Sequence, residues 1–415
     1  EGKQLSDTAR MSEAGSHSPP LPESTDSAEQ PARVQLRRSR FTSDGGATLS
    51  SSSSIDSCKS TTTASGSRRR NMPMMYQMYE SQYEDLRGTV CGPDTPDFFP
   101  VQAANIFRKA LSGIDTNDQE IINVLVRHSN FQRQKILDAY EDMHEKSLLQ
   151  DLEEETGGFF LEMTTALFRP AHVFDTHELH KSISNRYGDR SVAVEIACTR
   201  SVRQLKVIRE QYNNDYRKQL ERDIGIKVEG VFGRMLSALL CKQREDPRGG
   251  RKLDDELIEQ QAVQLSQMSL DDLSRNVAFF EQLFVLRSWR HIAAVVSRAD
   301  ELRVDKKELE QLLRKNKAIH SETRLMLITI LSVARNCQLY FAEKLRTAMT
   351  GDRPDHPTII RIIVTRSEID LIDIAMEYKR RYQRSLDFDI QQTCSGDYLR
   401  LMLALIAPTN VADVE

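Results

Sequence analysis

The chain has 415 residues, enough for a large buried core, yet only 39% of them are apolar and the mean hydropathy is −0.51. Part of the chain is therefore expected to stay outside that core. The formal net charge of −4 does not indicate the basic domain of a nucleic-acid-binding protein, so no nucleic-acid partner is expected. The six cysteines have no paired spacing, and no apolar run approaches the roughly 18 residues of a membrane span. Both features predict a soluble cytoplasmic protein with reduced thiols.

The N-terminal part is predicted to be disordered. Residues 1–75 are rich in Ser, Thr, Pro, Gly and charged residues, and they cannot bury enough surface to offset their chain entropy. Residues 76–97 are expected to be a linker or part of a short amphipathic helix, whose apolar face is formed by Met72, Tyr76, Tyr79 and Tyr83. Such a face fits a groove-binding partner, for example an EF-hand protein, or packs back onto the core of the same chain.

Residues 98–408 are predicted to form one all-α core, followed by a short tail at 409–415. The core divides into four repeats of about five short helices, at about 98–170, 171–243, 252–334 and 335–408. Strand patterns are nearly absent, and no single copy can bury its apolar face alone. The four copies are therefore expected to fold as one unit.

The repeats are defined by residues that recur at fixed spacing. A serine suited to a helix N-cap recurs at intervals of 72, 87 and 79 residues, at Ser129, Ser201, Ser288 and Ser367. In three copies a tyrosine is followed eleven residues later by an aspartate, as in Tyr140 and Asp151, Tyr212 and Asp223, and Tyr378 and Asp389. The third copy keeps only Leu309 and Leu313 of this pattern. In the fourth copy, Ser367 and Asp370 predict a capping box at the start of a helix.

These motifs resemble the annexin family. The fourth copy has Thr365-Arg366-Ser367 between two helices and Cys394-Ser395-Gly396-Asp397-Tyr398 at a later turn, and the resemblance extends over about residues 98–408. It implies a curved disc of four repeats whose convex face binds calcium and, through calcium, acidic phospholipid headgroups. The expected partner is then the acidic phospholipid surface of a membrane, to which the protein binds peripherally.

The resemblance also assigns a calcium loop to each copy. In the family this loop reads Lys-Gly-x-Gly-Thr, with an acidic residue about 40 positions further on, because Ca²⁺ takes about six to eight oxygens from converging carbonyls and a carboxylate. In the first copy the matching residues are Leu111, Gly113, Asp115 and Glu155, with Asp115 in place of the second glycine. The resemblance therefore predicts one weak calcium site, in the first repeat only.

The other three copies depart from the calcium pattern. The carboxylate position holds Lys227 in the second copy, falls within 314–317 in the third and holds Thr393 in the fourth. An ammonium about 4 Å from a divalent ion costs several kcal/mol even at an effective dielectric constant of about 20. Basic residues at the former loops offer direct contact with anionic lipid instead, at Arg186, Lys227, Arg275 and Arg353. Neighbouring acidic residues dilute their field, and neutral drift on solvated loops is the alternative explanation.

A polar centre is the other family feature that this sequence retains. Four residues match it, namely Asp175, Glu178, Arg200 and Arg361. The resemblance implies a hydrophilic central passage. The alternative, which we favour, is a buried charge network that fixes how the two halves of the core pack.

The sequence therefore predicts an annexin-like phospholipid- and membrane-binding protein whose calcium dependence is weak or largely lost. The alternatives are a calcium-independent interaction scaffold and calcium-independent binding of acidic membranes through the basic residues of the former loops. An enzyme is not expected. His172, Asp175, His177 and His180 lie close in sequence, but they do not form the HExxH pattern of a zinc enzyme.

Overall fold

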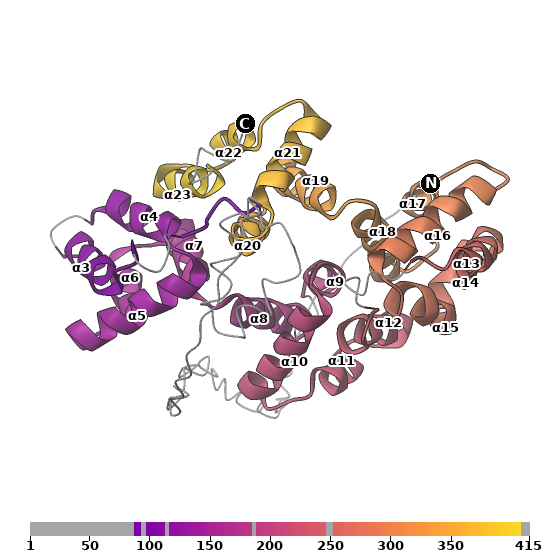
Figure 1. Cartoon of the computed structure of the whole chain (residues 1–415), viewed down its shortest axis with the longest axis horizontal. Coiled ribbons are helices and arrows are strands. Elements are labelled where there is room, and N and C mark those ends of the chain that lie inside the picture. Colours follow the sequence, from indigo (N-terminus) through magenta and orange to yellow (C-terminus); the bar gives the residue numbers. More distant parts are fainter. Residues whose placement is uncertain (1–86, 93–96, 113–115, 185–187, 246–251, 408–415) are drawn as a thin grey trace, which may run out of the picture. The chain divides into compact units, whose positions relative to one another are not determined.

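The computed structural model describes residues 87–92, 97–112, 116–184, 188–245 and 252–407 (Figure 1). The predicted tail at 1–75, most of the segment at 76–97 and the C-terminal tail at 409–415 lie outside the described residues. Within the described ranges every regular element is helical. The prediction of an all-α fold built from four repeats is confirmed.

The first, second and fourth repeats follow the same helical plan. The first comprises α3 (Pro100–Ala110), α4 (Asp118–Arg127), α5 (Asn130–His144), α6 (Leu148–Glu155) and α7 (Gly158–Phe168). The second comprises α8 (Ala171–Ser184), α9 (Arg190–Thr199), α10 (Val202–Tyr216), α11 (Leu220–Lys227) and α12 (Gly230–Cys241). The fourth comprises α19 (Cys337–Thr350), α20 (His356–Arg366), α21 (Leu371–Tyr382), α22 (Leu386–Thr393) and α23 (Gly396–Ile406).

The third repeat departs from this plan in its first half. It comprises α13 (Asp255–Gln267), α14 (Leu270–Arg275), α15 (Val277–Phe280), the π-helix η4 (Glu281–Val285), α16 (Trp289–Leu302), α17 (Leu309–Lys315) and α18 (Ser321–Arg335). Here α15 and η4 together take the place that α4 has in the first repeat, and α14 occupies the loop before them.

Three of the four recurring serines begin the helix that follows them. Ser129 and Ser201 each accept a hydrogen bond from the backbone N–H three residues on. The side-chain oxygens of Gln132 and Gln204 accept one from the N–H of the serine, which completes a capping box at the start of α5 and of α10. Ser288 accepts the same type of bond at the start of α16.

The capping box predicted for Ser367 and Asp370 is wrong. Ser367 is the C-cap residue of α20 and has a right-handed helical backbone conformation. Its hydroxyl donates to the carbonyl oxygen of Val364 at 2.9 Å. The carboxylate of Asp370 accepts instead from the guanidinium of Arg366, at 2.7 and 2.6 Å. Arg366 is buried, and a buried guanidinium requires an anionic partner. Asp370 therefore does not cap α21.

A buried hydrogen bond between tyrosine and aspartate recurs in three repeats. The tyrosine hydroxyl donates to the carboxylate at 2.5 Å in each, from Tyr140 to Asp151, from Tyr212 to Asp223 and from Tyr378 to Asp389. These bonds tie α5 to α6, α10 to α11 and α21 to α22. In the third repeat, Arg335 of α18 forms ion pairs with Asp300 of α16 and Glu310 of α17. A surface ion-pair cluster thus connects the helices that the buried pair connects elsewhere.

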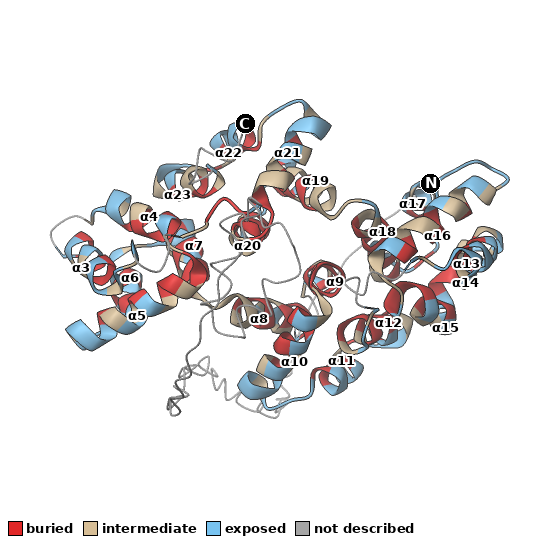
Figure 2. Ribbon diagram, viewed as in Figure 1, coloured by how far each residue is buried: buried red, intermediate tan, exposed pale blue. Residues whose placement is uncertain are grey.

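The apolar side chains form two cores, each shared by two repeats. One core contains the second and third repeats, where α9 packs on α18 and α12 packs on η4. The other contains the first and fourth repeats, where α20 and α23 pack on α7. Helices such as α10 have one buried and one exposed face (Figure 2). Each repeat therefore buries its apolar face against a neighbour, as expected of units that cannot do so alone.

Residues 87–92 lie against the fourth repeat. The N–H of Val90 donates to the carbonyl oxygen of Ser367 at 3.0 Å. At Gly88, an added Cβ would lie 2.5 Å from the backbone of Glu368. Only glycine permits such a close approach of two backbones, so the entry of the chain into the core is fixed locally by this residue.

Candidate calcium and membrane-contact site

The calcium site predicted for the first repeat faces a cavity. Glu155 is the last residue of α6, and its exposed side chain lines a cavity of about 460 Å³ together with Thr116 and Asp118 near the start of α4. The hydroxyl of Thr116 donates to the carboxylate of Asp118 at 3.0 Å. Leu111 is the buried C-cap residue of α3. The fold therefore places Glu155, the predicted carboxylate, and Thr116, which follows the predicted loop, in the lining of one cavity.

Two of the predicted ligands, Gly113 and Asp115, lie outside the described residues. The carboxylate position itself can be compared between repeats, because α6, α11 and α22 each have eight residues. Their last residues are Glu155, Lys227 and Thr393. The helix lengths thus support the sequence alignment of the carboxylate position in these three repeats.

In the second repeat, Lys227 belongs to a closed ring of polar side chains. Its ammonium donates to the hydroxyl of Ser184 at 2.9 Å and forms an ion pair with Asp223 at 3.0 Å. The hydroxyl of Ser184 lies 2.9 Å from Nε2 of His180, whose Nδ1 lies 2.9 Å from the hydroxyl of Tyr212. Tyr212 donates to Asp223 and closes the ring. An ammonium with two partners therefore occupies the end of α11.

His180 stands where the first and fourth repeats have an arginine. Arg108 and Arg346 each contact the aspartate of the tyrosine–aspartate pair in their own repeat, at 3.2 and 2.6 Å. Burial and the charge of Lys227 lower the pKa of His180 to about 4, so its imidazole is neutral at pH 7. In the second repeat, therefore, the cation beside the aspartate is not an arginine of the first helix, α8. It is Lys227, at the end of the fourth helix, α11.

In the third repeat, the carboxylate position is occupied by a residue whose side chain bonds to the turn that follows α17. Counting from Leu309 places Asn316 at this position, within the predicted range 314–317. Its side-chain oxygen accepts from the two backbone N–H groups at positions two and three further on, at 2.8 and 3.0 Å. The preceding loop contains α14, where Arg275 forms an ion pair with Asp271 at 3.0 Å. The loop that the resemblance assigns to calcium in this repeat therefore contains a short helix.

In the fourth repeat, the corresponding groups also bond within their own helices. The hydroxyl of Thr393 donates to the carbonyl oxygen of Asp389 at 2.7 Å. Asp355, in the loop after α19, accepts from the backbone N–H of Thr358 at 3.1 Å and caps α20. The hydroxyl of Thr393 and the carboxylate of Asp355 are thus both engaged in hydrogen bonds within the protein.

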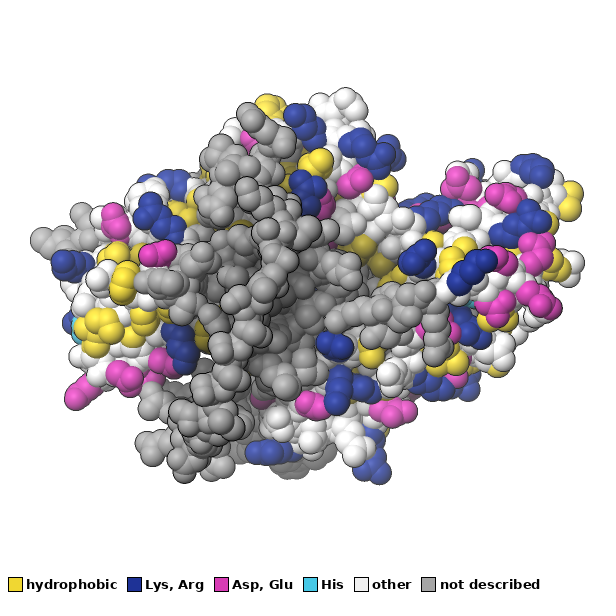
Figure 3. All heavy atoms as spheres, viewed as in Figure 1, with side chains coloured by type: hydrophobic (Ala, Val, Ile, Leu, Met, Phe, Trp, Pro, Cys, Tyr) yellow, Lys and Arg dark blue, Asp and Glu magenta, His cyan; other side chains and the backbone are white. Residues whose placement is uncertain are grey.

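The four basic residues predicted to contact lipid have different surroundings. Arg186 lies outside the described residues. Lys227 and Arg275 form ion pairs with acidic residues four positions earlier in their helices. Arg353 is exposed in the loop between α19 and α20. On the face drawn in Figure 3, acidic and basic side chains are interspersed over the third repeat, around α13 and α16.

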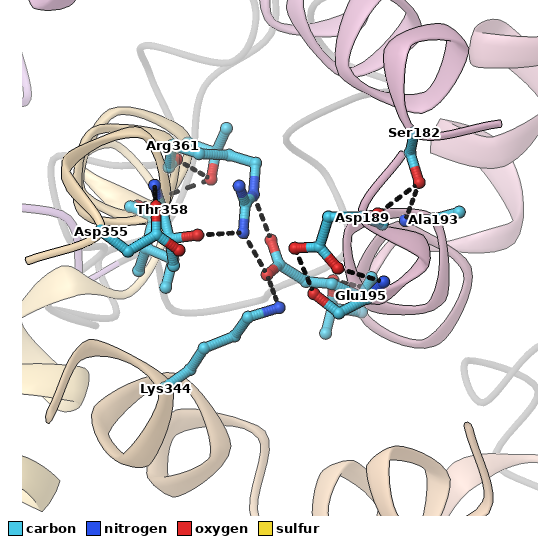
Figure 4. A network of polar contacts seen from close by, with 12 residues as sticks. Ser182, Asp189, Ala193, Glu195, Lys344, Asp355, Thr358 and Arg361 are labelled. Atoms are coloured by element: carbon cyan, nitrogen blue, oxygen red, sulfur yellow. Dashed lines mark hydrogen bonds and ion pairs between the residues drawn. The ribbon is translucent and has the colours of Figure 1, made fainter. Parts of the chain in front are cut away.

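A polar seam lies between the two apolar cores, formed by Asp175, Arg200, Glu195, Arg361 and Lys344. Arg200 donates two hydrogen bonds to Asp175, at 2.6 and 2.8 Å, and both side chains are buried. Glu195 of α9, which is 0% exposed, accepts two bonds from Arg361 of α20, at 3.1 and 3.0 Å (Figure 4). Lys344 of α19 lies 2.7 Å from the same carboxylate. The seam therefore joins a helix of one core to two helices of the other.

The remaining residue of the predicted polar centre, Glu178, contacts His177, whose Nδ1 lies 3.3 Å from its carboxylate. Burial raises the pKa of Glu178, but the bond to His177 and the charges of Lys181 and Arg361 lower it overall. Its link to Arg361 is thus electrostatic. The direct partner of Arg361 is Glu195.

Glu195 and Lys344 are the residues of the seam that sequence reasoning missed. Glu195 is the single charged residue in the run Val192 to Ala197. A carboxylate in an otherwise apolar, buried helix needs a cationic partner, so the run contained a usable signal. Lys344 lies among other polar residues of its helix, so its position in the sequence provided no signal that it belongs to the seam.

Two features of the described ranges bear on the alternatives. No group of three or more His, Cys, Asp or Glu side chains is placed there to hold a metal ion; the calcium loops expected from the sequence use backbone carbonyls as well. In the same ranges, no helix combines the length and the apolar character that a membrane crossing requires.

Comparison with known proteins identifies the family. The sequence model of the annexin family matches residues 102–167, 174–239 and 340–405, in the first, second and fourth repeats. Mouse annexin A3 is 34% identical over 320 residues, which cover 77% of this chain and 96% of that protein. Human annexin A7 is 32% identical over 310 residues, 75% of this chain and 62% of the relative. The structure of chicken annexin V superposes with a TM-score of 0.70 at 30% identity, over 77% of this chain and 99% of the other.

The fold and the site define a four-repeat helical protein of the phospholipid- and membrane-binding class. The chain belongs to the annexin family. Calcium binding occurs in this family, and a calcium-bound annexin, annexin (Sm)1, has the same fold with a TM-score of 0.67. The third repeat, which the family model leaves unmatched, is also the one without the buried tyrosine–aspartate pair.

Proposed function

We propose that this annexin binds acidic phospholipid membranes peripherally, from the cytoplasm, and that its calcium dependence rests on the first repeat alone. The observation that carries the proposal is the position of Glu155, an exposed carboxylate at the end of α6 that faces a cavity. At the equivalent positions Lys227 is an ammonium in an ion pair, the side chain of Asn316 bonds to the turn after its helix, and Thr393 bonds to its own helix. One carboxylate near one loop fits a weak site for Ca²⁺.

The calcium site is tested by calorimetric titration of the full chain with calcium. The wild type is expected to show one weak binding event, and Glu155→Gln is expected to abolish it because a neutral amide removes the charge of the site. Lys227→Gln is the matched control, since it changes the equivalent position of the second repeat and should leave the calcium heat intact. Absence of heat in the wild type at millimolar calcium, or unchanged heat in Glu155→Gln, refutes the proposal.

Membrane binding is tested by sedimentation with phosphatidylserine vesicles. Calcium is expected to increase the pelleted fraction of the wild type and to have no such effect on Glu155→Gln. A wild-type protein that fails to pellet at low salt, with or without calcium, would instead favour the calcium-independent interaction scaffold.

A second candidate is direct contact of basic residues with anionic lipid, without calcium. Arg353 favours it, because its side chain is exposed in a former calcium loop. Lys227 and Arg275 favour it less, since their ion pairs with Asp223 and Asp271 offset their charge. This mode predicts pelleting in the presence of a calcium chelator that decreases with added salt and with Arg353→Ala. We also propose that the protein is not an enzyme.

A further inference from the structure

The cavity at Glu155 is shared by two repeats that are far apart in sequence. One wall is formed by the first repeat, at the start of α4 and at the turn between α6 and α7. The other wall is formed by the fourth repeat, at the first residue of α20 and at the turn between α22 and α23. Its volume of about 460 Å³ lies within the range of about 300–1,000 Å³ that is usual for small-ligand pockets. The calcium hypothesis uses only one of these walls.

Equivalent positions of the two repeats face this cavity. Phe159 follows Gly158 at the start of α7, and Asp397 follows Gly396 at the start of α23. Both glycines have positive φ, +59° and +62°, which turns the chain sharply at the first residue of each helix. The repeat symmetry therefore brings an aromatic ring and a carboxylate, at matching positions, to one cavity.

Three rings line the cavity and contact one another. The ring centroids of Phe159 and His356 are 4.2 Å apart, and that of Tyr398 lies 5.5 Å from each. Phe159 is nevertheless 41% exposed, so part of its surface remains available to a ligand. Burial lowers the pKa of His356, which keeps its imidazole neutral at pH 7.

The charged groups of the lining have one sign. Three carboxylates line the cavity, those of Asp118, Glu155 and Asp397, and no lysine or arginine is among the described residues of the lining. Arg400 pairs with Asp397 from the same helix, which leaves the carboxylates of the first repeat to set the charge. A cavity with aromatic surface and negative charge favours a cation that is also partly apolar.

We propose that this cavity binds an alkylammonium ion, with Glu155 and Asp118 providing the charge and Phe159 the aromatic surface. The ion is either a free amine such as choline or the amine of a zwitterionic phospholipid headgroup, since both present the same chemistry. This binding goes beyond the calcium and acidic-lipid function proposed above, because it requires no calcium. Glu155 belongs to both sites, whereas Phe159 belongs to the amine site alone.

The test is a calorimetric titration of the full chain with choline and with glycerophosphocholine, in the presence of a calcium chelator. The variant is Phe159→Ser. The matched control is Phe388→Ser, because Phe388 on α22 is exposed to a similar extent, 44%, and does not line the cavity. We expect the wild type and the control to bind with equal affinity and Phe159→Ser to bind about tenfold more weakly, as removal of a cation–π contact implies.

Each result decides between the sources or against the proposal. Binding of choline supports a free amine, and binding of glycerophosphocholine alone supports the lipid headgroup, provided that Phe159→Ser weakens it. No heat with either probe at millimolar concentration overturns the proposal, and so does equal affinity in Phe159→Ser and Phe388→Ser. A separate calcium titration distinguishes the two hypotheses. Phe159→Ser should leave the heat of calcium binding unchanged, whereas Glu155→Gln should weaken the binding of both calcium and the amine.

Discussion

Glu195→Gln removes one negative charge from the polar seam between the two cores. In the wild type, burial by itself raises the pKa of Glu195, but the charges of Arg361 and Lys344 outweigh it and lower the pKa well below its ordinary range. The carboxylate is 0% exposed and accepts bonds from Arg361 at 3.1 and 3.0 Å, with Lys344 at 2.7 Å. After the substitution, two cations would share one neutral amide at a position that is buried in the protein.

The expected loss is about 3–5 kcal/mol of the free energy of unfolding, the usual result of leaving one partner of a buried ion pair uncompensated. Urea unfolding at pH 7 measures it. The control is Glu259→Gln, which removes the same charge from an exposed ion pair with Arg298 and should lose far less, because exposed pairs contribute little. If Glu195→Gln loses no more stability than Glu259→Gln, the seam does not hold the two cores together.

The pH dependence provides an independent check on Glu195. A carboxyl group whose pKa is lowered on folding stabilises the protein above its unfolded pKa of about 4.3. This contribution is lost as the pH falls from about 4.3 toward the lower pKa of the folded state. The difference in stability between the wild type and Glu195→Gln should therefore be constant near neutral pH and decrease below about pH 4. A difference that does not change with pH would show that the charge of Glu195 is not its source.

Three further substitutions test local interactions. Tyr212→Phe should reduce the free energy of unfolding by about 1.5–3 kcal/mol in urea titrations, because it removes a hydrogen bond to the charged carboxylate of Asp223; an unchanged midpoint contradicts this. His180 has a folded pKa of about 4, below its unfolded value of about 6.5, so the wild type loses stability as the pH falls through that interval. His180→Asn should flatten the pH profile of stability there, and an equal slope in both proteins argues against a neutral buried imidazole. Ser129→Ala should cost about 1 kcal/mol through loss of a helix cap, whereas Ser367→Ala should cost clearly less in the same assay; equal losses would restore the capping role predicted for Ser367.

Much of the fold could be predicted because its signals are local. The capping boxes of Ser129 and Ser201 close within one helical turn, so their spacing in sequence defines them. The bond between Tyr212 and Asp223 joins residues that are eleven positions apart. Recurrence of such short-range patterns at intervals of 72, 87 and 79 residues was sufficient to find the four repeats. The exception, Ser367, failed because Arg366 binds the aspartate that the capping pattern requires.

The candidate site was only partly predictable from the sequence. Glu155 was found through the family pattern, because that pattern places the carboxylate at a defined spacing from the loop of the same repeat. The ring around Lys227 was not, because His180 and Ser184 approach it from a different helix. Lys227 was interpreted as a basic residue that contacts lipid. Its partner Asp223 lies on the same helix, and the packing of α8 on α11 adds the second partner, Ser184.

By itself, therefore, the sequence determined the helices, the repeats and the chemistry of the carboxylate position in the first, second and fourth repeats. The tertiary structure decided which repeats share a core and which charges meet. Glu195 and Arg361 are 166 positions apart, and the cavity at Glu155 takes one wall from the fourth repeat. The physical reason is that hydrogen bonds within a helical turn depend on spacing alone, whereas contacts between repeats depend on which apolar faces bury each other.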